Sequence, residues 1–188
     1  MPDGTNMPAG PARVCGSCTA CCKTREIYED PVLETFLKPP GVWCKHCDKG
    51  RGCQLWNRAE RPRSCLSFCC SWLEGDFSSD ERPDRTKIVA EMQEGTLAGT
   101  VLLLWELVPQ ALKSSFADNL KRKVLAAGHP VLLLPCEGVR VLVVPSNVKG
   151  HVARDKILDL GIKVEDHQII DTTFVRDLTM GIRPRWVV

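Results

Sequence analysis

Ten cysteines lie between Cys15 and Cys70, and this density constrains the chain more than any other feature of its 188 residues. Thiols this crowded either pair as disulfides or ligate metal ions that prefer sulfur. Disulfides suit small secreted domains that cannot bury a core of their own. The N-terminal residues lack the apolar stretch of a signal peptide, and ordinary core-forming sequence follows the cysteines. We therefore favour metal ligation over disulfides and expect a cytoplasmic protein.

The cysteines fall into three groups whose spacings are typical of metal ligands. They are Cys15-x2-Cys18-x2-Cys21-Cys22, Cys44-x2-Cys47-x5-Cys53 and Cys65-x3-Cys69-Cys70. A Cys-x-x-Cys turn directs two sulfurs toward one metal and brings backbone N–H groups to the thiolates, whose negative charge they offset. Gly16 fits such a turn. Paired units of this kind are typical of zinc held by four thiolates. The first group also resembles the opening of bacterial iron–sulfur sequences, but the x3-Cys-Pro continuation is missing, which excludes a ferredoxin.

The number of metal sites stays open at this point. Ten thiols exceed one four-thiolate site by six, so the chain has either two sites or one site with spare cysteines. The adjacent Cys21 and Cys22 would close a strained ring on a single metal. They suit two irons of a cluster, two separate metals, or one metal and a packing role. Basic residues between Lys38 and Arg63 either offset the thiolate charge or form a solvated loop.

Three stretches of the sequence resemble a known family. They are Cys15-Gly16-Ser17-Cys18-Thr19-Ala20-Cys21-Cys22, Gly52-Cys53-Gln54-Leu55-Trp56, and the Arg61-Pro62-x-x-Cys65 motif with its following Cys69-Cys70-Ser71-Trp72. Together they are similar to the signature of the CxxCxxCC cysteine-cluster proteins, also called YkgJ-type or zinc- or iron-chelating domain proteins. Family members are held to bind zinc or iron through about eight cysteines, and a relative that methylates flagellin lysines is described as an iron–sulfur protein. The resemblance implies a metal site but no particular reaction.

The resemblance also implies which cysteines are ligands. The positions on the family pattern are Cys15, Cys18, Cys21, Cys22, Cys44, Cys53, Cys65 and Cys70. We include Cys47 as a ligand, although many relatives carry an aliphatic residue there. If Pro62 begins a helix, Cys65 and Cys69 share one face at i,i+4, whereas the pattern favours Cys70, which we follow. Trp56 and Trp72 are expected to wall the site against water.

The rest of the chain has ordinary globular patterning, and we expect an α+β fold. We divide the chain into a flexible lead-in (1–14), a cysteine-cluster metal-binding region (15–84) and a small α+β region (85–188). The α+β region is expected to be a small antiparallel sheet covered by one or two helices, against which the metal-organised cysteine-rich half packs. Hydrophobic periodicity predicts strands over Thr86–Met92, Leu97–Val108, Val131–Leu134 and Val139–Val144, the last two as a hairpin, and helices over Ala111–Ala127 and His151–Leu160.

Composition and the lack of known catalytic motifs reduce the number of functions that the sequence supports. A net charge of +2 and the lack of interleaved aromatic residues disfavour nucleic acid, and no apolar run is long enough to span a membrane. There is no phosphate-binding loop and no recognisable catalytic set, and His46 is expected to be a surface residue. We therefore predict a metal-binding protein that holds an iron–sulfur cluster or zinc. The alternatives are an iron–sulfur-dependent modifying enzyme of the methyl-transfer type or its partner, and an interaction module with structural zinc. The sequence decides neither whether the protein is an enzyme nor which protein, if any, is its partner.

Overall fold

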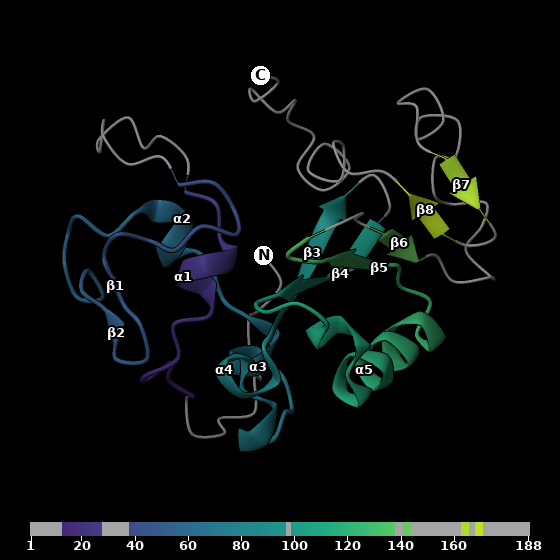
Figure 1. Cartoon of the computed structure of the whole chain (residues 1–188), viewed down its shortest axis with the longest axis horizontal. Helices are drawn as coiled ribbons and strands as arrows, with labels where there is room; N and C mark the ends of the chain where they lie inside the picture. Colours follow the sequence, from purple (N-terminus) through teal and green to yellow (C-terminus); the bar gives the residue numbers. More distant parts are fainter. Residues whose placement is uncertain are drawn as a thin grey trace, which may run out of the picture.

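The computed structural model describes residues 13–27, 38–96, 99–137, 141–143, 163–165 and 168–170. Figure 1 shows a cysteine-rich half of short elements beside a sheet half, with helix α5 below the sheet. The cysteine-rich half has little regular structure. Among its described residues, each α-helix is a single turn, and the hairpin of two short strands has two residues in each strand. Its elements are α1 (Cys21–Thr24), β1 (Cys47–Asp48), β2 (Gly52–Cys53), α2 (Arg63–Leu66), α3 (Ser71–Glu74), η1 (Ser79–Glu81) and α4 (Pro83–Thr86).

The second half is a six-stranded sheet in the order β3-β4-β5-β6-β8-β7. Its elements are β3 (Ile88–Thr96), β4 (Gly99–Glu106), η2 (Ala111–Lys113), α5 (Ser115–Ala126), β5 (Val131–Leu134), β6 (Val141–Val143), β7 (Lys163–Glu165) and β8 (Gln168–Ile170). The α+β class is confirmed. The sheet is mixed, however, because β4 and β5 run parallel while the other neighbours are antiparallel. The crossover through α5 explains the parallel pair, since a helix between two strands returns the chain in the same direction.

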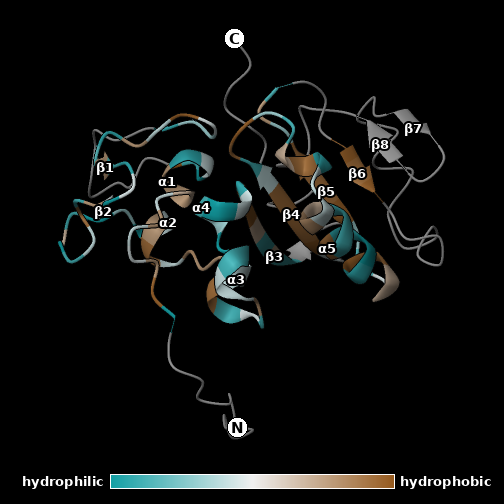
Figure 2. Ribbon diagram, turned by 60° about the horizontal axis from the view of Figure 1, so that its bottom comes forward, coloured by the Kyte–Doolittle hydropathy of each residue, from teal (hydrophilic) through white to brown (hydrophobic). Residues whose placement is uncertain are grey.

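Side chains that alternate along β3 belong to two different buried clusters, one on each face of the sheet. Ile88 and Ala90 belong to a buried cluster with Leu102 and Leu104 of β4, and α5 packs against that cluster through Phe116 and its neighbours. In Figure 2 the strands beneath α5 are hydrophobic, while much of the helix surface is hydrophilic. The residues between them face the opposite way, toward the cysteine-rich half. The sheet is therefore a middle layer between α5 and the cysteines.

The opposite face of the sheet joins the two halves of the protein. Val89 of β3 and Leu107 form one buried cluster with Ala20 and Cys70, and Trp105 packs against it. Two polar contacts reinforce this junction. Arg25 forms an ion pair with Glu91 of β3 at 3.0 Å, and the Lys23 ammonium donates to the Leu107 carbonyl at 2.6 Å.

Ser114 divides the predicted helix over Ala111–Ala127 into two parts. Residues 111–113 form the 3₁₀ turn η2, and α5 begins only at Ser115. The Ser114 hydroxyl accepts a hydrogen bond from the Ala117 N–H at 3.3 Å, which makes Ser114 the N-cap. The prediction of one continuous helix was wrong because the apolar stripe continues across a capping residue that starts a new helix.

The strands agree with the predicted ones in order and differ at their ends. The hairpin of β5 and β6 is confirmed as an antiparallel pair. The predicted helix over His151–Leu160 lies outside the described residues. No helix in the described part of the chain is both long and apolar enough to cross a bilayer.

Candidate metal centre

Two Cys-x-x-Cys segments form the same tight turn. The Cys18 N–H donates to the Cys15 carbonyl at 2.9 Å, and the Cys47 N–H donates to the Cys44 carbonyl at 3.1 Å. Gly16 adopts a φ of 54°, a left-handed conformation that glycine tolerates best, which confirms the role predicted for it. Backbone N–H groups in these turns also face sulfur. That of Ala20 lies against Cys18 and that of His46 against Cys44, and each favours the thiolate.

Backbone hydrogen bonds hold the first two cysteine groups together. The Cys44 N–H donates to the Cys22 carbonyl at 2.9 Å, so the second group is fixed to helix α1. Lys38, only 4% exposed, lies under the same helix. Its ammonium donates to the carbonyls of Lys23, Arg25 and Pro39. Burial lowers the pKa of Lys38, but three carbonyl acceptors compensate the ammonium group. Lys38 is thus a structural cation that joins the end of α1 to the following loop.

The cysteine groups surround one cavity of about 430 Å³. Eight cysteines line it: Cys15, Cys18, Cys21, Cys22, Cys44, Cys53, Cys65 and Cys70. They come from the turn before α1, from α1 itself, from the loop before β1, from β2, from α2 and from the residue that precedes α3. Segments separated by as many as 55 positions in the sequence (15 to 70) therefore present thiols to a single space.

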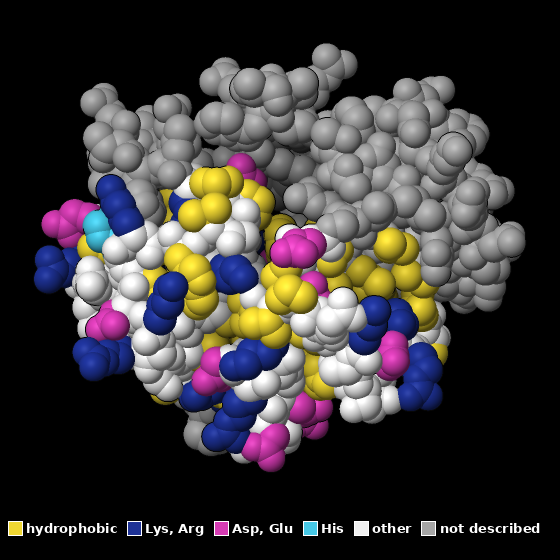
Figure 3. Space-filling view, viewed as in Figure 1, with side chains coloured by type: hydrophobic (Ala, Val, Ile, Leu, Met, Phe, Trp, Pro, Cys, Tyr) yellow, Lys and Arg dark blue, Asp and Glu magenta, His cyan; other side chains and the backbone are white. Residues whose placement is uncertain are grey.

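The rest of the cavity wall is apolar and cationic. Leu55, Trp56, Phe68 and Val89 are among the apolar residues that line it. Three arginines, Arg25, Arg51 and Arg61, also line it, and no Asp, Glu or His is found among the described residues of the wall. Figure 3 shows further Lys and Arg side chains spread over the surface of this half. Eight thiols with arginines and without carboxylates form an environment suited to a sulfur-rich centre of negative charge.

Burial keeps most of these thiols protonated when no metal is bound. Burial raises the pKa of Cys15 to about 12 and also raises the pKa values of Cys18, Cys44, Cys65 and Cys70. Cys21 is the exception, because a hydrogen bond from the Cys22 thiol lowers the pKa of Cys21 to about 7. The adjacent pair thus shares one proton. A metal ion, which binds thiolates, would have to displace the protons of the other cysteines.

Two cysteines of the dense region lie outside the cavity wall. Cys47, which the sequence also predicts as a ligand, is not among the lining residues; its side chain is hydrogen-bonded to Cys22. Cys69 is likewise absent from the wall, and its thiol is hydrogen-bonded to Glu74. Helix α2 ends at Leu66, so the i,i+4 relation considered for Cys65 and Cys69 does not apply. Cys70, only 8% exposed, faces the junction with the sheet.

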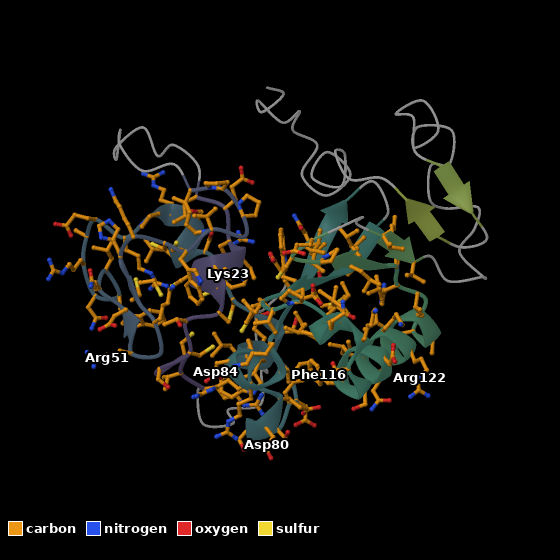
Figure 4. All side chains as sticks on the ribbon, in the orientation of Figure 1. Lys23, Arg51, Asp80, Asp84, Phe116 and Arg122 are labelled. Atoms are coloured by element: carbon orange, nitrogen blue, oxygen red, sulfur yellow. The ribbon has the colours of Figure 1, made fainter. Side chains whose placement is uncertain are left out.

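Other residues singled out in the sequence fall at and around this cavity. Trp56 lines it and is 46% exposed, whereas Trp72 packs beside Cys70 without lining it. His46 is not part of the wall. Cys136 is an exposed free thiol far from the cluster in sequence. In Figure 4 the labelled Arg51 lies at the outer edge of the cysteine-rich half, whereas Lys23 lies where α1 meets the sheet.

The thiols share a cavity but are not arranged as a coordination sphere. Within the part of the chain that the structure describes, no group of three or more Cys, His, Asp or Glu side chains is positioned to hold a metal ion. All eleven cysteines are free thiols. The donor set nevertheless fits a metal that prefers sulfur, because the described wall offers thiols and cations with no competing carboxylate.

Sequence reasoning missed part of this wall. Arg25 received no role, and Val89 was read only as a strand residue. The signal for Arg25 was its position four residues after Cys21, one helical turn away. Val89 could not be assigned from the sequence, because nothing local shows which face of a strand covers a distant loop.

The fold and the cavity define a class of protein: an α+β chain with a multi-cysteine cavity to whose wall the sheet contributes Val89. No family model and no solved structure matches the chain. A UPF0153 protein of Pseudomonas aeruginosa is 32% identical over 81 residues, which are 43% of this chain and 93% of that protein. Because the match covers nearly all of that relative, the chain belongs to the UPF0153 family. This is the uncharacterised family that includes the YkgJ-type cysteine-cluster proteins.

Proposed function

We propose that the protein binds a metal centre in the 430 Å³ cavity, with ligands drawn from the eight cysteines that line it. The observation that carries this proposal is the convergence of those cysteines on one cavity whose described wall holds no carboxylate or imidazole. Inert packing does not account for it, because cysteines that only fill a core are fully buried, whereas seven of these eight are partly exposed around one cavity. When bound, the centre would supply soft Lewis-acid or redox chemistry, and the cysteines would hold it as thiolates.

The size of the cavity favours a centre with more than one metal ion. One tetrahedral zinc ion takes four ligands at about 2.3 Å, so it would use half of the eight cysteines. It would also occupy only a small part of the cavity. A water molecule, which is larger than a zinc ion, takes up about 30 Å³ in the liquid, and the cavity measures about 430 Å³. An iron–sulfur cluster is also held by four cysteines, but its several metal ions and bridging sulfides fill more of the space. We therefore place the iron–sulfur interpretation ahead of zinc.

The test is anaerobic purification of the full chain, followed by analysis of iron, zinc and acid-labile sulfide. The proposal predicts at least one equivalent of metal per chain. Iron with sulfide and broad visible absorption supports the cluster, whereas colourless protein with stoichiometric zinc supports the structural-zinc alternative. Protein that carries neither metal, and binds neither ferrous iron with sulfide nor zinc on reconstitution, would refute the proposal.

A further inference from the structure

Two partly buried arginines in the cavity wall each retain a buried hydrogen-bond donor without an acceptor. The Nε atoms of Arg25 and Arg61 are inaccessible to solvent and have no partner among the described residues. A buried donor without an acceptor is destabilising, so each such group calls for an explanation, such as a ligand or a functional role. Both side chains line the same cavity as the eight cysteines.

Each guanidinium is also held in place by its surroundings. Arg25 lies over the Phe68 ring at 4.4 Å and is paired with Glu91 at 3.0 Å. Arg61 lies over the Trp56 ring at 4.1 Å and donates from Nη2 to the Cys65 carbonyl at 2.8 Å. Stacking fixes the plane of each guanidinium, and the terminal nitrogens are partly engaged. Both guanidinium groups lie close enough to the Cys21 thiol to lower its pKa, so the Nε donors are the groups left for a cysteine sulfur of the wall.

The third arginine of the wall provides a contrast. The Arg51 side chain is 83% exposed, and its nearest acid is Asp48 at 3.7 Å. Water can solvate Arg51 fully, whereas the Nε atoms of Arg25 and Arg61 lack access to water. The wall thus contains two buried donors and one solvent-facing cation of the same residue type.

We propose that Arg25 and Arg61 are positioning residues that donate their Nε–H groups to sulfur atoms of an anionic metal–thiolate centre in this cavity. This inference rests on the proposed function and deepens it, because it assigns the charge of the centre and the groups that balance it. Thiolates around a metal carry excess negative charge, and N–H donors beside the sulfurs stabilise that charge and raise the affinity for the metal. The two acceptor-free donors are satisfied only when the centre is present.

The experiment compares R61Q, R61K, the double variant R25Q/E91Q and the control R58Q, all as full chains purified anaerobically with their metal. The double variant removes the Arg25–Glu91 ion pair as a unit and so avoids leaving a buried carboxylate alone. The first readout is the rate of metal loss to excess EDTA. We expect R61Q and R25Q/E91Q to lose metal about 10-fold to 100-fold faster than the wild type, the range found when outer partners of metal ligands are removed.

The remaining variants separate charge from geometry. R58Q should match the wild type within about twofold, since Arg58 is exposed, does not line the cavity, and carries a well-screened charge. R61K should be intermediate, because lysine keeps the charge but has no Nε donor in a planar guanidinium. The second readout is the thiolate-to-metal absorption of the bound centre. It should move to longer wavelength in R61Q, since a sulfur that loses a hydrogen bond gives up its electrons more readily.

The possible outcomes distinguish this inference from the proposed function. Wild-type protein that binds no metal overturns both. A second outcome overturns the inference alone. In it the wild type binds metal, and R61Q and R25Q/E91Q lose metal at the wild-type rate and have the wild-type spectrum. Faster loss in R58Q equal to that in R61Q would also overturn it, because the effect would then be one of general charge. A merely structural role for Arg61 would leave the spectrum of the bound centre unchanged.

Discussion

Removal of the Cys70 thiol should weaken metal binding about 100-fold, whereas removal of its neighbour Cys69 should leave metal binding unchanged. Cys70 lines the cavity and is 8% exposed, and Cys69 does not line it. The two variants, C70A and C69A, differ by one position in the chain and remove the same atom. They are therefore matched controls for each other.

The size of the effect follows from sharing the binding free energy among the ligands. A structural metal site of four ligands contributes about 10–16 kcal/mol. One ligand in four then accounts for about 3 kcal/mol, which corresponds to about 100-fold in affinity. The stability of the metal-free protein should change much less when the Cys70 thiol is removed. Cys70 packs with Val89 and Leu107, and losing one buried sulfur of about methylene size costs about 1 kcal/mol.

The assay is competition for the bound metal against a chelator, with urea denaturation of the metal-free proteins measured in parallel. C70A should lose metal at about 100-fold lower chelator concentration than the wild type, and C69A should coincide with the wild type. The reasoning would be refuted if C69A lost metal as readily as C70A. It would also be refuted if C70A bound metal with unchanged affinity, because the cavity wall would then not define the ligands.

Four further predictions follow from individual contacts. C47S should retain full metal content in elemental analysis, because Cys47 lies outside the cavity wall and serine can replace its hydrogen bond with Cys22. Metal affinity measured by chelator competition should rise between about pH 6 and 9, because binding displaces thiol protons. Urea denaturation of the metal-free protein should show stability falling as pH rises above 9, since burial raises the pKa of Cys15 from 9.0 to about 12 and the unfolded chain then ionises first. E106A should lower the unfolding free energy in urea by about 3 kcal/mol, because the Glu106 carboxylate accepts two backbone hydrogen bonds at 3.0 and 3.1 Å.

Local patterns in the sequence predicted the local structure well. Strands β3, β4 and β5 form within or close to the predicted segments, because buried β-branched and leucine runs specify strands with little help from elsewhere. The turn at Gly16 was predictable because glycine tolerates a positive φ. The break at Ser114 was missed because one apolar stripe crosses it.

Long-range arrangement was less accessible from the sequence. The parallel pairing of β4 with β5 depends on how a crossover packs, which no single segment encodes. The choice between Cys69 and Cys70 depends on where α2 ends and on which side of the chain meets the sheet. The family resemblance favours Cys70, and Cys70 rather than Cys69 lines the cavity, but which of the two binds metal stays a prediction.

The sheet explains how a half with so little regular structure can hold eight thiols around a cavity. Its elements are single turns and a two-residue hairpin, so its backbone alone cannot fix the positions of the sulfurs. Val89 of β3 lines the cavity and also packs with Cys70 in the junction between the halves. The cavity wall is therefore partly a sheet surface, and the cysteines are arranged against a rigid layer. Metal binding and docking of the two halves should consequently be coupled, because each stabilises the arrangement that the other requires.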